Sequence, residues 1–134
     1  MLPDRASAAV PEVSTVLLVE DESLLRVTTA DHLRSVGYHV IEAATGEEAV
    51  RVLSAGAKVH VIFSDVSLPG EMGGFSLAMW IRNHLRFIPI VLTSGVESAV
   101  RPLRRQHLVP FISKPYLLED VEQLLSRVLA QKWP

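Results

Sequence analysis

Apolar and polar positions along the chain fall into two alternating patterns from residue 15 onward. Short apolar runs rich in β-branched residues predict five strands, over 15–20, 38–43, 59–64, 88–94 and 108–113. Apolar residues at helical spacing follow each run and predict five helices, over 23–36, 45–56, 75–85, 97–107 and 117–131. Gly37 ends the first helix, a capping box at Thr45–Glu48 begins the second, and Pro102 interrupts the fourth.

The regular alternation of strands and helices predicts the fold class. It is typical of an α/β domain with a doubly wound parallel sheet, here of five strands in the order 2-1-3-4-5. Residues 1–14 contain two prolines and no sustained period, and we interpret them as a flexible N-terminal leader before one domain over 15–132. Ligands of such sheets bind outside the carboxyl ends of the strands, so candidate functional residues are those that end a strand.

Composition excludes several classes of protein. The chain has 134 residues, of which 49% are hydrophobic and 21% charged, as in an ordinary globular domain. A formal net charge of −2 argues against direct binding of nucleic acid through bulk charge, and the absence of cysteine excludes disulfides and thiolate metal sites. The five histidines lack a metal-ligand spacing. No apolar run approaches the ~20 residues of a membrane span and no signal peptide begins the chain, so we expect a soluble cytoplasmic protein without membrane insertion.

Acidic residues end two strands that the predicted order makes neighbours. Glu20 and Asp21 follow the first strand, and Asp65 ends the third. Two carboxylates ~4 Å apart repel each other by roughly 1 to 4 kcal/mol at surface-like dielectric, and a bound hard cation removes this repulsion. A site of few oxygen ligands suits Mg²⁺. The sequence therefore predicts a magnesium site at this edge of the sheet.

A hydroxyl group and an ammonium group end the last two strands. Ser94 follows the fourth strand's apolar run, and Lys114 follows the fifth. Pro115 biases the backbone of Lys114 towards an extended conformation. Acids, a cation, a hydroxyl and an ammonium around one carboxylate can stabilise a transferring phosphoryl group, with Asp65 as the nucleophile.

Four motifs carry a resemblance to a known family. They are VLLVEDE (16–22), FSDVSLPG (63–70), IPIVLTSG (88–95) and FISKPY (111–116). Their order and spacing resemble those of the receiver domains of bacterial two-component response regulators, the flavodoxin-like (βα)5 domains of the chemotaxis-regulator type. The resemblance covers about residues 15–132. It implies a phosphoacceptor that assists its own phosphorylation and dephosphorylation rather than an enzyme with a separate substrate.

The resemblance also implies the roles of the strand-end residues. Asp65 would be the phosphoacceptor and, with Asp21 and the carbonyl of Ser67, a direct Mg²⁺ ligand. Glu20 would act on the metal mainly through water, and Lys114 would pair with the phosphoryl group.

The switch residues and the partners follow from the same resemblance. Ser94, rather than Thr93, takes the switch-hydroxyl position, since it lies five residues after Pro89 and directly before a small residue. Phe111 takes the aromatic switch position. The phosphoryl donor would be a sensor histidine kinase or a phosphotransfer protein, and output would pass through the fourth helix, fifth strand and fifth helix to an unknown protein. Phosphorylation-dependent homodimerisation is a further expectation.

The chain departs from the family pattern in two places. The loop over 70–74 is one residue longer than usual, as in receivers fused to hybrid kinases and in some that stand alone. The fourth helix is short and carries a basic cluster over 101–105. Two other functions stay open: a degenerate receiver that only binds partners, and a Mg²⁺-dependent aspartyl phosphatase. The phosphatase is disfavoured because Ser67 stands where such enzymes carry their second aspartate.

Overall fold

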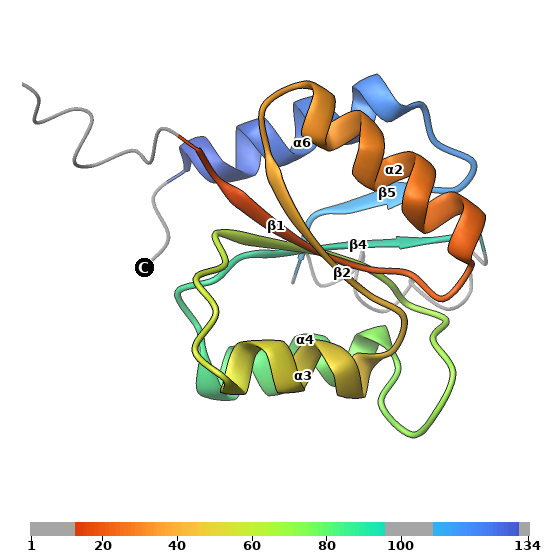
Figure 1. Ribbon diagram of the computed structural model, residues 1–134. Helices are drawn as coiled ribbons and strands as arrows, with labels where there is room; N and C mark the ends of the chain where they lie inside the picture. Colours follow the sequence, from red (N-terminus) through yellow and green to blue (C-terminus); the bar gives the residue numbers. More distant parts are fainter. Residues whose placement is uncertain (1–12, 96–108, 132–134) are drawn as a thin grey trace, which may run out of the picture.

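Five parallel strands form one sheet at the centre of the molecule. The computed structural model describes residues 13–95 and 109–131, and its sheet has the order β2-β1-β3-β4-β5 (Figure 1). This order confirms the predicted 2-1-3-4-5 arrangement. The strands are β1 Thr15–Val19, β2 His39–Ala43, β3 Val61–Asp65, β4 Ile90–Ser94 and β5 Phe111–Ser113.

Helices cover both faces of the sheet in two pairs. Helices α2 (Ser23–Ser35) and α6 (Leu118–Ala130) lie on one face, and α3 (Gly46–Ser54) and α4 (Gly74–His84) lie on the other (Figure 1). All four were predicted, with ends that differ by a few residues at most. Residues 1–12 of the leader predicted over 1–14, and the whole helix predicted over 97–107, lie outside the described residues. Within the described part of the chain, no helix is long and apolar enough to cross a membrane.

Each face of the sheet has its own apolar core, because successive side chains of a strand point to opposite faces. Leu17, Val19 and Ile62 pack with α3 and α4, whereas their neighbours Leu18 and Phe63 pack with α2 and α6. Strands β3 and β4 are buried along their whole length. Such continuous burial is typical of central parallel strands, and it fixes the carboxyl ends of β1, β3 and β4 beside one another.

The capping box predicted at the start of α3 is present. The hydroxyl of Thr45 accepts the N–H of Glu48 at 3.0 Å, and the Glu48 carboxylate accepts the N–H of Ala44 at 2.8 Å. Gly37, the predicted stop of the first helix, has a φ of 107°, a left-handed conformation that only glycine adopts without strain. Local sequence chemistry thus sets where α3 begins and where α2 ends.

Candidate functional site

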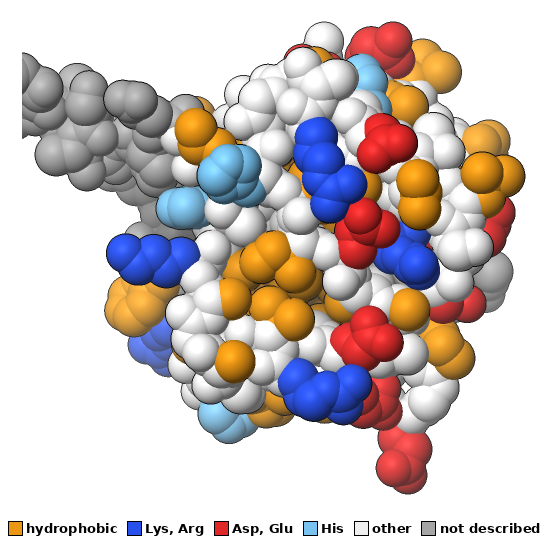
Figure 2. Space-filling view, in the orientation of Figure 1, with side chains coloured by type: hydrophobic (Ala, Val, Ile, Leu, Met, Phe, Trp, Pro, Cys, Tyr) orange, Lys and Arg blue, Asp and Glu red, His pale blue; other side chains and the backbone are white. Residues whose placement is uncertain are grey.

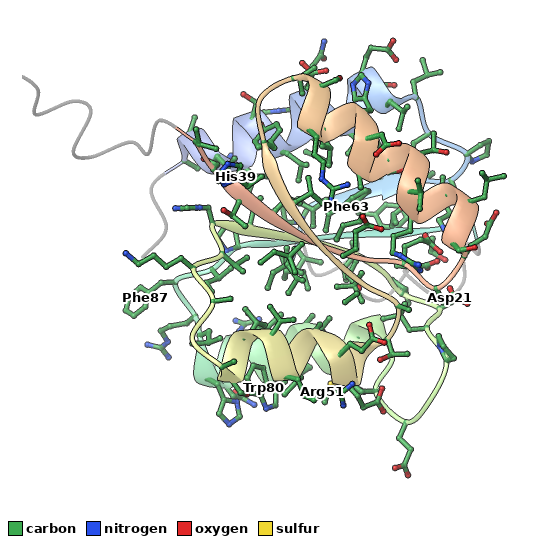
Figure 3. The ribbon with its side chains drawn as sticks, viewed as in Figure 1. Asp21, His39, Arg51, Phe63, Trp80 and Phe87 are labelled. Atoms are coloured by element: carbon green, nitrogen blue, oxygen red, sulfur yellow. The ribbon has the colours of Figure 1, made fainter. Side chains whose placement is uncertain are left out.

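Three carboxylates meet at the carboxyl ends of β1 and β3. Val19 lies opposite Ser64 in the parallel ladder, so Glu20 and Asp21 leave β1 where Asp65 ends β3. One oxygen from each of the three acids lies within 4.8 Å of the others. Glu20 and Asp65 are buried and Asp21 is exposed. Figure 3 shows Asp21 at this edge of the sheet, beside the loop that follows β3. The structure therefore brings the predicted acidic residues together.

The ammonium of Lys114 is shared between two of these acids. Its Nζ lies 2.6 Å from Oδ2 of Asp65 and 2.8 Å from Oε1 of Glu20. The backbone N–H of Lys114 also donates to the carbonyl of Ser94 at 3.0 Å, which continues the pairing of β5 with β4 beyond the end of the ladder. The main chain of β5 thus carries this lysine to the rim, as the sequence predicted.

Burial and charge shift the pKa values of this cluster. Burial, together with the charge of Asp65, raises the pKa of the Glu20 carboxyl and outweighs the lowering by Lys114 and by the N–H of Glu22. Burial alone would lower the pKa of the Lys114 ammonium, but its hydrogen bonds to Asp65 and Glu20 outweigh burial and raise that pKa. Lys114 is therefore charged at neutral pH.

The cluster suits a small hard cation. Three carboxylates and one ammonium leave two negative charges in excess at a partly buried rim. The donor set consists of carboxylate oxygens, and such oxygen donors are what Mg²⁺ and Ca²⁺ prefer. The chemistry of the site therefore fits the predicted metal.

The loop after β3 is held tightly against Asp65. The N–H of Ser67 donates to Oδ1 of Asp65 at 2.9 Å, and the N–H of Gly74 donates to the carbonyl of Val66 at 3.0 Å. A Cβ on Gly74 would overlap the carbonyl oxygen of Asp65, so α4 can begin here only with glycine. Ser67 is thereby fixed beside the phosphoacceptor candidate, and the role of its carbonyl as a metal ligand stays a prediction.

Glu47 anchors the far side of this loop, a contact that the sequence did not predict. Its carboxylate accepts the N–H of Met72 at 3.3 Å. Neighbouring Gly46 has no room for a side chain, because a Cβ there would overlap the carbonyl oxygen of Met72. The lengthened loop therefore rests on the first turn of α3. The Gly-Glu pair inside the capping box was the signal available in the sequence.

Arg26 supports the other side of the site and was also not predicted. Its guanidinium donates to the carbonyl of Glu20 at 2.9 Å and to the Glu42 carboxylate at 3.2 Å. It thereby ties the carboxyl end of β1 to both α2 and β2. An arginine in the second turn of an amphipathic helix carries no sequence signal for such a role.

The two predicted switch residues lie at different depths. Ser94 is buried at the end of β4, directly after Thr93, which lies opposite Asp65. Phe111 begins β5 opposite Leu92 and packs, half-buried, against the core on the α3 and α4 face. Ser94 is therefore at the rim and Phe111 is below it. The segment between them over 96–108 lies outside the described residues.

A known family shares this arrangement. The family model of the response regulator receiver domain matches residues 16–128 of this chain. The chain belongs to this family. This membership confirms the resemblance drawn from the four sequence motifs and the fold class that it implied.

Similar proteins include plant and bacterial members. The two-component response regulator ORR3 of Oryza sativa subsp. indica is 34% identical over 129 residues, which cover 92% of this chain and 98% of that protein. The solved receiver domain of the hybrid histidine kinase CckA is 32% identical with a TM-score of 0.73, covering 87% of this chain and 99% of that one. The response regulator TrrA of Thermotoga maritima, solved with Mg²⁺ and BeF, is 22% identical with a TM-score of 0.76, covering 86% of this chain and 98% of that one.

Proposed function

We propose that this receiver domain accepts a phosphoryl group on Asp65 and acts as a phosphorylation-controlled signalling module. One observation carries the assignment: Asp65 pairs with the Lys114 ammonium at 2.6 Å, lies within 4.8 Å of two further acids, and ends β3 opposite Thr93 of β4. Glu20 also pairs with Lys114, but it follows β1, which is not a neighbour of β4. A nucleophilic carboxylate in this setting has a fixed positive charge on one side and a cation-binding cluster on the other.

The transfer is a displacement at phosphorus. An oxygen of Asp65 uses an electron pair to form the new O–P bond, while the bond from phosphorus to the donor breaks. If the donor is a phosphohistidine, the departing imidazole nitrogen keeps the bonding pair and then takes a proton from water. Lys114 stabilises the negative charge on the phosphoryl oxygens, because its ammonium already lies at the attacking carboxylate. Attack of water on phosphorus later releases phosphate and restores the carboxylate.

Mg²⁺ is the cofactor that we propose for this site. Asp21, Asp65 and the carbonyl of Ser67 would hold it directly, and Glu20 would hold it through water. When bound, the cation neutralises charge on the phosphoryl oxygens and the carboxylates. TrrA, a protein of the same fold, was solved with Mg²⁺ and BeF, and the oxygen-rich cluster of this chain supports the same cofactor here.

The phosphoryl donor is, in our proposal, a sensor histidine kinase or a phosphotransfer protein. The chain is similar both to a response regulator and to the receiver of a hybrid histidine kinase, which supports a donor of this class. We place the receiver domain over 15–132 behind a leader over 1–14, in the cytoplasm, where such kinases hold ATP-derived phosphoryl groups. On the face shown in Figure 2, acidic and basic side chains of the described residues are interspersed. Such a mixed surface suits contact with a partner protein.

The signal leaves the site, we propose, through Ser94 and Phe111. A phosphoryl group on Asp65 adds charge and acceptor oxygens next to the end of β4. The Ser94 hydroxyl donates to one of these oxygens by moving inward, and Phe111 then rotates into the space released. The altered face would bind an output protein or a second copy of the chain.

Intact-protein mass spectrometry after incubation with acetyl phosphate and Mg²⁺ tests the proposal. We expect an adduct of about 80 Da, the mass of one phosphoryl group, that Asp65→Asn abolishes and the surface control Asp31→Asn retains. Steady release of phosphate without an adduct would instead indicate an aspartyl phosphatase. Neither adduct nor phosphate release would indicate a degenerate receiver that only binds partners. Either of these two outcomes would overturn the proposed function.

A further inference from the structure

Tyr116 makes a buried contact just behind the site. It lies two residues after Lys114, in the segment that joins β5 to α6. Its hydroxyl lies 3.3 Å from the hydroxyl of Thr29 on α2, a fully buried residue. Its ring packs on Phe63 of β3, with the centroids 5.7 Å apart and the planes at 56°. A side chain two positions beyond the lysine is thus fixed both to a helix and to the central strand.

One partner of Tyr116 lies on the strand that ends in a site acid, and the other lies on the helix that begins after the two other acids. Phe63 lies two residues before Asp65 on β3, on the same face of the sheet. Thr29 lies on α2, which begins directly after the acidic residues that end β1. Burial raises the pKa of the Tyr116 phenol. The charges of Glu20 and Asp65 also raise this pKa, and the charge of Lys114 lowers it. Tyr116 therefore lies close enough to sense the charges of the site without belonging to it.

Beyond the hydrogen bond from the Lys114 N–H to the Ser94 carbonyl, the segment that carries Lys114 has few other anchors among the described residues. Ser113 and Pro115 are exposed, and Leu117 is 65% exposed. Lys114 and Tyr116 are the half-buried positions between them. A lysine side chain is long and flexible, and its position depends on how firmly its backbone is held.

We infer that the Tyr116–Thr29 hydroxyl pair is a clamp that positions Lys114 for phosphoryl transfer; this inference rests on the proposed function. Neither residue touches the reacting atoms, so both are positioning residues. The clamp fixes the Lys114 backbone relative to α2 and β3, and the ammonium therefore stays between Asp65 and Glu20. Loss of the hydroxyl pair frees the segment, and the ammonium then spends less time where the phosphoryl group must bind.

Conservative substitutions separate the clamp from simple packing. Tyr116→Phe keeps the ring on Phe63 and removes only the hydroxyl, and Thr29→Val removes the partner hydroxyl with little change of shape. Thr29→Ser keeps a hydroxyl and should restore function. Tyr38→Phe is the matched control, because Tyr38 is the other tyrosine of the chain, hydrogen-bonds to Ser126 of α6, and lies before β2 at the opposite end of the sheet.

The first measurement is the initial rate of Asp65 phosphorylation by acetyl phosphate at saturating Mg²⁺. We expect Tyr116→Phe and Thr29→Val each to lower the rate roughly two- to tenfold, the range that one buried hydrogen bond corresponds to. The double variant should be no slower than either single variant, because both remove the same contact. Thr29→Ser and Tyr38→Phe should keep the wild-type rate, and Mg²⁺ affinity should stay unchanged in all five variants.

Epistasis with the lysine distinguishes positioning from a general loss of stability. In a Lys114→Met background, Tyr116→Phe should cause no further loss of rate, although it should still lower the melting temperature. A Tyr116→Phe rate equal to that of Tyr38→Phe would overturn the clamp, and so would a further loss of rate in the Lys114→Met background.

A second readout does not depend on phosphorylation. If the wild-type protein takes up no phosphoryl group, the proposed function fails, and the clamp is then decided by the side-chain NMR signal of Lys114. We expect that signal, assigned by its loss in Lys114→Met, to shift in Tyr116→Phe and Thr29→Val and to stay in place in Tyr38→Phe. An unchanged signal in all three variants would overturn the clamp independently of the function.

Discussion

Asp65→Asn removes one charge from the acidic cluster and leaves its shape nearly unchanged. The amide oxygen of asparagine can still accept the N–H of Ser67, which Asp65 accepts at 2.9 Å. Lys114 keeps its second partner, since Glu20 lies 2.8 Å from its ammonium. The substitution therefore tests the charge of Asp65 rather than the packing of the loop after β3.

The structure allows the size of the effect to be estimated. At an effective dielectric constant of about 20, unit charges 2.6 Å apart attract by about 6 kcal/mol, which is the interaction lost between Asp65 and Lys114. With 4.8 Å taken as the separation, the two other carboxylates each repel Asp65 by about 3.5 kcal/mol, and these repulsions are lost as well. The gains and losses nearly cancel. We therefore expect the free energy of unfolding without metal to change by no more than about 1 kcal/mol.

Mg²⁺ should make the wild-type protein more stable than Asp65→Asn, although the two should be nearly equal in stability without metal. At a Mg²⁺ concentration ten times the dissociation constant, binding to the native state alone stabilises it by about 1.4 kcal/mol. For a chain of 134 residues this corresponds to a rise in Tm of about 5 °C. Asp65→Asn removes one of the proposed direct ligands, so its rise should be less than half as large.

Thermal unfolding followed by tryptophan fluorescence, with and without Mg²⁺, measures both quantities. The control is Asp31→Asn, which removes a carboxylate that is 70% exposed on α2 and should leave the Mg²⁺ response intact. A full wild-type rise in Tm for Asp65→Asn would refute the assignment of Asp65 to the cation site. A metal-free loss above about 3 kcal/mol would show that the ion pair dominates and that the cancellation is wrong.

Three further predictions concern the acids and the switch. Asp21→Ala should weaken Mg²⁺ binding more than Glu20→Ala, because a direct ligand contributes more than one acting through water; equal dissociation constants by calorimetry would contradict this order. Burial raises the pKa of Glu20 above 4.5, so ionising it destabilises the folded state as pH rises through the folded pKa. Without metal, Glu20→Gln should therefore be the more stable protein at pH 7, and its advantage in urea denaturation should shrink as pH falls towards 4.5; an advantage independent of pH would refute the stated cause. Ser94→Ala should still take up phosphate on Asp65 but lose most of the amide NMR shifts that beryllofluoride causes around Phe111, and wild-type shifts in the variant would disprove the coupling.

The sequence by itself determined the order of the elements and the edge of the sheet where the site lies. Apolar runs and helical spacing are local signals, and they predicted all the strands and helices that the structure describes. The carboxyl ends of parallel strands share one edge, so acids that end β1 and β3 had to meet. The sequence pattern alone thus predicted that Asp65, Glu20 and Asp21 lie together at this edge of the sheet. Their chemical roles stay predictions, as does the helix over 97–107.

Only the tertiary structure decided how the side chains at this edge contact one another. Lys114 is 94 residues from Glu20 in the chain, and its placement between two carboxylates depends on the packing of β5 beside β4. Contacts such as Arg26 with the Glu42 carboxylate and Tyr116 with Thr29 leave no local pattern. The spacing of apolar residues shows which face of a helix or strand a residue occupies. These contacts instead depend on distances between elements that approach one another only when the core packs.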